Sequence, residues 1–287
     1  MCQLMKITQR FLLVLLLAGL TACGGLTIQG VDLSRVATAI KHTSNLKMKT
    51  QDQEIIIGKN TASVLLSKAA LANDDDLQAY VNKVGYWLAR QSSRPSLPWR
   101  FVVLDNNAIN AFAAPGGYVF ITTGMLGSLN NEAELAGVLA HEIGHVVRKH
   151  HLIALQSQAQ KGLAADLLTL ASQSTGNSSN TTLPVDFDKA VLNLYGRGLE
   201  RGDELAADEY GLELASKSGY DPYAFISVLQ SIDSRATSTK SSLERFTKTH
   251  PDAQTRLVSV EPVLEELDEL PLNTQTLAQR FLANTRY

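Results

Sequence analysis

The chain has 287 residues, of which 45% are hydrophobic, so it can bury a large core in one domain or in a domain with an added lobe. Lysine and arginine number 26 against 28 aspartates and glutamates, a net charge of −2, so the overall charge does not suggest a protein that binds nucleic acid. The only cysteines, Cys2 and Cys23, lie near the N-terminus, which excludes a disulfide framework or a cysteine-based metal site in the folded body.

The N-terminus has the pattern of a bacterial lipoprotein signal. Two basic residues precede the apolar run Phe11–Leu20, which is too short to span a bilayer and long enough for a signal peptide. The run ends in Leu-Thr-Ala-Cys, which resembles a lipoprotein cleavage and acylation site at Cys23. We therefore predict a signal peptide over residues 1–22 and a lipidated tether over 23–50. An aspartate directly after the lipidated cysteine would suggest retention in the inner membrane, but here Gly24 follows it. The resemblance therefore implies that the lipid anchors the chain to the periplasmic face of the outer membrane. An ordinary secretory signal is the alternative.

We expect one folded domain over residues 51–287, and its first part reads as two helices and three strands. Apolar residues recur with helical spacing over residues 52–71 and 75–91. Short apolar runs separated by turn-forming residues predict strands over residues 99–104, 108–113 and 118–122. The exposed edge of such a sheet could bind an extended peptide by strand addition, or the strands could serve only to complete the core.

The most informative motif is His141-Glu142-x-x-His145, which lies within a predicted helix. Asn131 followed by Glu134 has the spacing of a capping box and marks the start of that helix. Residues four apart share one helical face, so the two imidazoles can hold one Zn²⁺ with Glu142 beside the metal-bound water. The alternative is that these residues are ordinary, partly buried polar groups.

The rest of the chain is predicted to be mainly helical. A Leu- and Ala-rich helix is expected over residues 152–171, a polar surface loop over 172–182, and a long helix over 186–218 that ends at Gly219. Pro222 starts a further helix. These elements predict an α+β fold, mostly helical, with a small mixed β-sheet beside the helix that carries the histidines.

A catalytic zinc site needs a third protein ligand in addition to the two histidines. His151 is near in sequence, but on a continuing helix it would be rotated about 240° from His145 and lie about 9 Å further along. Glu204 is the other candidate, since Asp208 lies one turn later and could hydrogen-bond a ligand imidazole. The two alanines between them, at positions 206 and 207, would let this helix approach the first closely. A solvated, charged helix face is the alternative.

Three motifs together resemble the gluzincin metalloendopeptidases, the family that includes HtpX, the CAAX prenyl endopeptidase, BepA and LoiP. They are His141-Glu142-x-x-His145, Glu204-x-x-x-Asp208 and Asn110-Ala111-Phe112-Ala113 followed by Ala-Pro-Gly-Gly. The resemblance covers about residues 54–256 and implies a zincin-like fold with one Zn²⁺ per chain. No segment after the signal is apolar enough to span a membrane, so the chain resembles the lipoprotein branch that includes LoiP.

The resemblance also implies roles for individual residues. It implies that His141, His145 and Glu204 are the zinc ligands, that Glu142 is the general base and that Asp208 supports a ligand imidazole. It implies that the substrate cleft is lined by Asn110, Ala111, Phe112 and Ala113. In family members of this kind a His-Pro pair six residues before an arginine returns to the active site. Here that implies that His250 stabilises the oxyanion or fills the open zinc position, with Arg256 as an oxyanion or supporting group.

These features predict a zinc-dependent metalloendopeptidase on the periplasmic face of the outer membrane that degrades unfolded or misassembled envelope proteins. Its expected partners are those substrates, the membrane through the lipid on Cys23, and the outer-membrane assembly machinery. Two alternatives stay open. One is a periplasmic chaperone or assembly factor whose latent protease site is capped by His250, and the other is a zinc hydrolase of non-peptide cell-wall material.

Overall fold

The computed structural model describes residues 27–28, 31–32, 50–158, 187–236, 250, 253–268 and 275–285. Cys23, the predicted signal peptide, most of the predicted 152–171 helix and the predicted 172–182 loop lie outside these residues.

The chain divides into two units, Met1–Asn45 with Leu163–Thr182, and Leu46–Gly162 with Leu183–Tyr287. In the first, the described part is the antiparallel pairing of β1 (Thr27–Ile28) with β2 (Val31–Asp32). The second unit contains all the elements described below, and the division into signal, tether and one domain stays a prediction.

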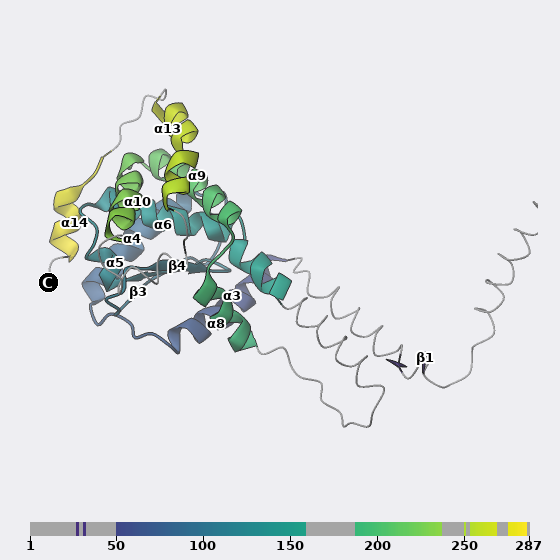
Figure 1. The fold of residues 1–287 in the computed structure, drawn as a ribbon. Helices are drawn as coiled ribbons and strands as arrows, with labels where there is room; N and C mark the ends of the chain where they lie inside the picture. Colours follow the sequence, from purple (N-terminus) through teal and green to yellow (C-terminus); the bar gives the residue numbers. More distant parts are fainter. Residues whose placement is uncertain are drawn as a thin grey trace, which may run out of the picture. The chain divides into compact units, whose positions relative to one another are not determined.

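Three strands form a mixed sheet in the second unit (Figure 1). β3 (Arg100–Leu104) runs parallel to β5 (Tyr118–Thr122), and β5 runs antiparallel to β4 (Ala111–Ala114). The strand order is β3-β5-β4, which leaves β4 at an edge. The predicted mixed sheet is confirmed, although β4 begins at Ala111 instead of residue 108. Asn106 Oδ1 accepts a hydrogen bond from the Ala108 amide at 2.9 Å, which holds that stretch in a turn.

Alternate side chains of the strands point to opposite faces of the sheet, and helices cover both faces. One set packs with α4 (Asp75–Gln91) and α6 (Glu132–Val147) in the main core, and comprises Phe101, Val103, Ala111, Ala113, Val119 and Ile121. The other set packs with α3 (Gln51–Leu66), and comprises Val102, Leu104, Phe112, Ala114, Tyr118 and Phe120. Burial on both faces gives the edge strand a firm support.

Further helices whose bounds lie within the described residues are α5 (Thr123–Leu126), α8 (Phe187–Arg197), α9 (Arg201–Lys217), α10 (Tyr223–Ala236), α12 (Ala253–Ser259), α13 (Glu261–Asp268) and α14 (Ala278–Thr285). Figure 1 shows α6, α9 and α10 on one side of the sheet and α3 and α8 on the other. Within the described residues, no helix is long and apolar enough to span a bilayer.

The predicted starts of two helices are confirmed by their caps. Asp74 accepts a hydrogen bond from Leu77 N at 2.8 Å at the start of α4, and Asn131 accepts one from Glu134 N at 2.9 Å at the start of α6. The Glu134 carboxylate accepts a hydrogen bond from the backbone N–H of Asn130, one residue earlier than in the usual capping box. The first helix, α3, ends at Leu66, five residues short of the predicted end at residue 71.

The single long helix predicted over residues 186–218 is wrong, because two helices, α8 and α9, take its place. The chain leaves α8 at Gly198, whose φ is +80°. Glycine adopts this left-handed backbone without the steric cost that other residues have, and it commonly ends helices. The break lets α8 pack on α3 while α9 runs along α6.

Candidate zinc site

The helices α6 and α9 lie in close contact because a glycine on each faces the backbone of the other. A Cβ added at Gly144 would lie 3.0 Å from Ala207 O, and one added at Gly211 would lie 2.9 Å from His141 N. Of the two alanines predicted to permit this approach, Ala207 is buried at the contact, whereas Ala206 is half-buried. The contact brings the carboxylates of α9 beside the imidazoles of α6.

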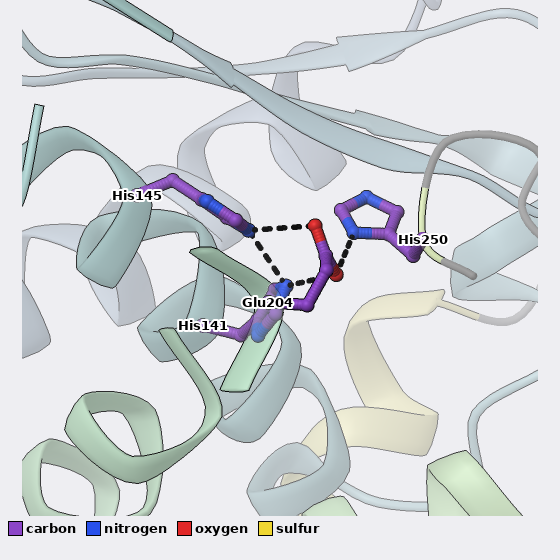
Figure 2. Close-up of side chains that lie close together, drawn as sticks. All are labelled: His141, His145, Glu204 and His250. Atoms are coloured by element: carbon purple, nitrogen blue, oxygen red, sulfur yellow. Dashed lines mark hydrogen bonds and ion pairs between the residues drawn. The ribbon is translucent and has the colours of Figure 1, made fainter. Parts of the chain in front are cut away.

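Four potential ligands converge in a buried cluster: His141, His145, Glu204 and His250 (Figure 2). One ligand atom from each lies within 4.8 Å of all the others. His141 Nε2 lies 3.0 Å from His145 Nε2 and 3.7 Å from Glu204 Oε2. His145 Nε2 lies 3.5 Å from Glu204 Oε1. The structure therefore brings together the three predicted ligands and His250.

These distances fit a zinc ion. Tetrahedral zinc with bonds of about 2.0–2.1 Å holds its ligand atoms about 3.3 Å apart, within the observed spread. Glu204 Oε1 and Glu142 Oε2 are buried and form no hydrogen bond with any described residue. Burial lowers the pKa of His145 well below its ordinary value, so this imidazole is neutral. A neutral imidazole beside an unsatisfied carboxylate oxygen is a donor set that a divalent cation satisfies.

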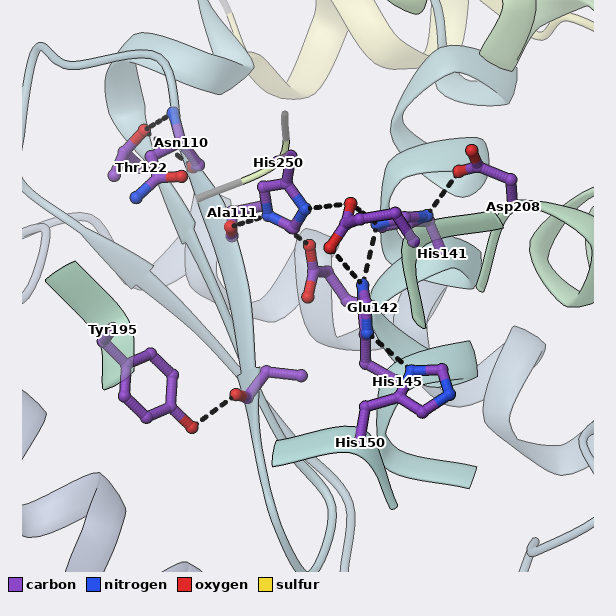
Figure 3. Close-up of polar contacts among 12 residues, drawn as sticks. Asn110, Ala111, Thr122, His141, Glu142, His145, His150, Tyr195, Asp208 and His250 are labelled. Carbon is purple, nitrogen blue, oxygen red and sulfur yellow. Dashed lines mark hydrogen bonds and ion pairs between the residues drawn. The ribbon is translucent and has the colours of Figure 1, made fainter. Parts of the chain in front are cut away.

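Asp208 and Arg256 hold the first ligand, His141, from behind. His141 Nδ1 lies 2.8 Å from Asp208 Oδ1, a contact drawn in Figure 3. The Arg256 guanidinium donates two hydrogen bonds to the Asp208 carboxylate, at 2.6 and 2.7 Å. Burial favours the neutral acid, but Arg256 and His141 overcome it and lower the pKa of Asp208 below its ordinary value. The anionic Asp208 keeps the proton of His141 on Nδ1 and leaves Nε2 for the metal.

The predicted general base, Glu142, is 1% exposed and lies beside the ligand cluster. Burial raises the pKa of its carboxyl, although the nearby His250 and His141 lower it in part. A carboxylate with a raised pKa accepts a proton more readily than an exposed one, and that suits a group that must take up a proton and release it again.

His250 lies on the opposite side of Glu204 from the α6 histidines (Figure 2). Its Nδ1 is 2.8 Å from Glu204 Oε2, and its Nε2 is 3.6 Å from Glu142 Oε1. Burial disfavours its cation, but the two carboxylates outweigh burial and raise the pKa of His250 to about 9. Burial raises the pKa of Glu204, but the positive charge and hydrogen bond of His250 outweigh burial and lower this pKa to about 2. His250 and Glu204 therefore form a buried ion pair within the ligand cluster.

The predicted substrate strand, β4, has its outer edge covered by side chains (Figure 3). Asn110 O accepts a hydrogen bond from Thr122 N, on the strand β5, so alternation turns the carbonyls of Ala111 and Ala113 toward the free edge. His250 Nε2 lies 3.2 Å from Ala111 O, and the Tyr195 hydroxyl donates to Ala113 O at 2.7 Å. Both acceptors that a substrate strand would use are therefore occupied from within the chain. The side chain of Phe112 points away from the zinc cluster, into the core of the other sheet face.

A mainly apolar cavity of about 160 Å³ adjoins this edge. Side chains of α3, β4 and α8 line it, including Leu65, Phe112, Leu194 and Tyr195. His250, a member of the zinc cluster, also lines it. The side of the sheet that α8 covers is thus not filled completely.

His151 lies outside the ligand cluster, as predicted, although the helix does not continue to it. α6 ends at Val147, and Lys149 has a φ of +62°, which turns the chain out of the helix. The His151 ring stacks on Tyr195, with ring centroids 4.8 Å apart, and lies 5.5 Å from the ring of His145.

Two neighbours of the site were not identified from the sequence. His150 Nδ1 lies 2.9 Å from His145 Nδ1. In the sequence, His150 is marked only by its position five residues after His145, which does not indicate a contact between the two rings. Tyr195 contacts Ala113 in a structure in which the helix ends just before Gly198. The prediction of one continuous helix across Gly198 could not show that Tyr195 lies at the edge of the sheet.

Residues 75–263 match the description Peptidase family M48. The match covers more than half of the chain and includes both zinc-binding motifs. The chain belongs to peptidase family M48.

Relatives of this M48 chain include proteases of bacterial and mitochondrial systems. The beta-barrel assembly-enhancing protease of Yersinia pestis is 30% identical over 72% of this chain and 43% of its own length. The corresponding protein of Escherichia coli K12 is 28% identical over 82% of this chain and 48% of its own length. The mitochondrial metalloendopeptidase OMA1 of Schizosaccharomyces pombe is 30% identical over 65% of this chain and 53% of its own length. The chain therefore spans about half the length of these relatives.

Proposed function

We propose that this M48 chain is a zinc-dependent metalloendopeptidase. The observation that carries the proposal is the buried group of His141, His145 and Glu204 with Glu142 beside it. Zinc held there would act as a Lewis acid toward the scissile carbonyl and lower the pKa of water. A peptide-bond hydrolase needs a base next to such a site, and Glu142 is in reach of the same position.

Other residues of the chain would carry out proton transfer, stabilise the oxyanion and bind the substrate. Glu142 takes a proton from the attacking water and passes it to the leaving amine. His250, protonated and 3.6 Å from Glu142, is placed to donate to the oxyanion once it is released from Glu204. β4 would bind the substrate as an added strand, and its outward carbonyls at Ala111 and Ala113 would accept main-chain hydrogen bonds.

We further propose that the substrates are unfolded or misassembled proteins of the bacterial envelope, and that Cys23 carries a lipid that anchors the chain to the outer membrane. The proposal is supported by the lipoprotein-like N-terminal sequence and by the similarity to beta-barrel assembly-enhancing proteases. Strand addition suits such substrates because main-chain hydrogen bonds tolerate many sequences, whereas a folded protein offers no free extended segment.

The test of the peptidase is Glu142→Gln. The variant should bind zinc as the wild type does and should lose cleavage of casein by at least about 100-fold, since the amide cannot take a proton. Glu209→Gln, on the exposed outer face of α9, is the matched control and should cleave normally. Full cleavage by zinc-loaded Glu142→Gln would overturn the proposal.

A second candidate function, a chaperone or assembly factor with a latent protease site, is favoured by the occupied edge of β4. With Ala111 O and Ala113 O both bonded, the protein in this form cannot add a substrate strand. Under this alternative, cells that produce only Glu142→Gln would assemble their outer membrane normally, whereas under the peptidase proposal they would show the defect of a deletion strain.

A further inference from the structure

We propose that His150 is a positioning residue of the zinc site, which accepts the hydrogen bond that orients His145. The two Nδ1 atoms lie 2.9 Å apart, and both side chains are buried (Figure 3). The ring planes are twisted by 75° and the ring centroids lie 5.1 Å apart, a separation that two imidazoles with Nδ1 atoms 2.9 Å apart have when these atoms point at each other. The proposal rests on the zinc site and is independent of what the site cleaves.

The position of the protons follows from the metal. A histidine that binds zinc through Nε2 must keep its proton on Nδ1, where it needs an acceptor. The acceptor at His145 Nδ1 is His150 Nδ1, which is possible only if the proton of His150 is on its other nitrogen. That nitrogen, Nε2, faces Asp203 at 3.8 Å from Oδ1. The geometry therefore assigns one tautomer to each histidine.

The backbone is bent to bring His150 to this place. On a continuing helix it would lie about 140° around the axis from His145 and could not reach the ring. Instead, Lys149 takes the left-handed backbone, with a φ of +62°, which is uncommon for a residue with a side chain. Its ammonium lies 3.5 Å from Glu54, which is 1% exposed and also accepts two hydrogen bonds from Arg94. These contacts hold the turn that presents His150.

The two ligand histidines of α6 thus have different partners. His141 donates to the anionic Asp208, whose charge is balanced by Arg256, and His145 donates to a neutral imidazole. Neither arrangement adds net charge to the site. The other charged groups at the metal position are Glu204, Glu142 and His250, which lies 2.8 Å from Glu204 and 3.6 Å from Glu142.

The test compares His150→Leu with His150→Asn. Leucine fills the space without an acceptor, whereas the amide oxygen of asparagine reaches the place of the Nδ1 atom. Zinc affinity is measured by competition with a chromogenic chelator, without any substrate. Loss of a hydrogen bond of this kind lowers metal affinity about 10- to 100-fold, which is the change expected for His150→Leu. His150→Asn should retain most of the affinity.

The matched control is His151→Leu, which removes the adjacent buried imidazole while leaving the hydrogen bond to His145 intact. It should bind zinc as the wild type does. The absorption spectrum of the cobalt-substituted protein gives a second readout, and it should change in His150→Leu because the His145 ring reorients, but not in His151→Leu. The proposal is overturned if His150→Leu binds zinc normally or if His150→Asn loses as much affinity as His150→Leu. Equal thermal destabilisation of His150→Leu with and without zinc would also overturn it, because the residue would then be only structural.

Discussion

Histidines that are all buried carry different charges at this site, and the carboxylates that face them decide which. Burial, and then the positive charge of His250, lower the pKa of His151 to about 3, and Glu204 raises it only in part. Burial acts on His250 as well, but Glu204 and Glu142 reverse the effect and raise its pKa to about 9. A buried charge persists only where a partner offsets its desolvation, and Glu204 is that partner here.

The zinc-free protein should therefore lose a stabilising contribution from His250 at alkaline pH. The folded pKa of about 9 is above the ordinary value of 6.5, so the contribution is complete below pH 6.5 and is lost as the pH rises through 9. It is measured as the difference in unfolding free energy between wild type and His250→Gln, which should fall by up to about 3 kcal/mol over this range. Glu204, Glu142 and Arg256, the charged groups that face His250, remain in both proteins. A difference that does not change with pH would contradict the ion pair.

The zinc site depends on how two helices pack, because α6 carries two of the predicted ligands and α9 carries the third. Gly211 sets the distance, since its Cα faces the backbone of His141 and leaves no room for a methyl group. At this separation the carboxylate of Glu204 lies 3.7 Å from His141 Nε2 and 3.5 Å from His145 Nε2.

Gly211→Ala should weaken the site by pushing α9 away from α6. Overpacking of a close backbone contact costs about 1–3 kcal/mol, and the same displacement should lower zinc affinity. Gly202→Ala is the control in the same helix, because its added methyl group meets open space and should leave stability unchanged or increase it. Urea unfolding and chelator competition measure the two effects. Equal behaviour of the two variants would show that the close approach is unimportant.

The helix α8 is the second element that bears on function, through Tyr195. If its hydroxyl blocks a substrate, Tyr195→Phe should free Ala113 O for one more main-chain hydrogen bond to a peptide. One net hydrogen bond contributes about 0.5–1.5 kcal/mol, so KM for an extended peptide should fall by a factor of about 2 to 10. Steady-state kinetics on such a peptide measure the change. A fall in kcat at constant KM would indicate instead that the hydroxyl serves the reacting carbonyl.

For the whole molecule, the proposed attachment to a membrane depends on Cys23, which lies outside the described residues. A tagged fatty acid supplied to cells should label the wild type, and Cys23→Ala should abolish the label, because the thiol is the proposed site of acylation. Cys2→Ala, which changes the cysteine within the predicted signal peptide, is the control and should keep the label. Normal secretion of an unlabelled wild type would instead support an ordinary secretory signal.

Much of the fold was predictable because its signals are local. The strands have side chains that alternate in period two, and the helices α4 and α6 start at residues that cap them. Their ends were less predictable. Gly198 could be tolerated within a helix or could end one, and nothing in its immediate sequence decides between these.

The spacing of His141 and His145 determines by itself that two imidazoles share a helical face, because that relation depends only on the geometry of one helix. Glu204 and Asp208 form a second local pair, and the family resemblance connected the two. The tertiary structure decided what depends on contacts between distant segments. It placed His250 against Glu204, Tyr195 on the edge strand and His150 behind His145. The contacts of His250 and Tyr195 require separate segments to pack together. The contact of His150 requires a left-handed backbone at Lys149, a conformation that a lysine in the sequence does not predict.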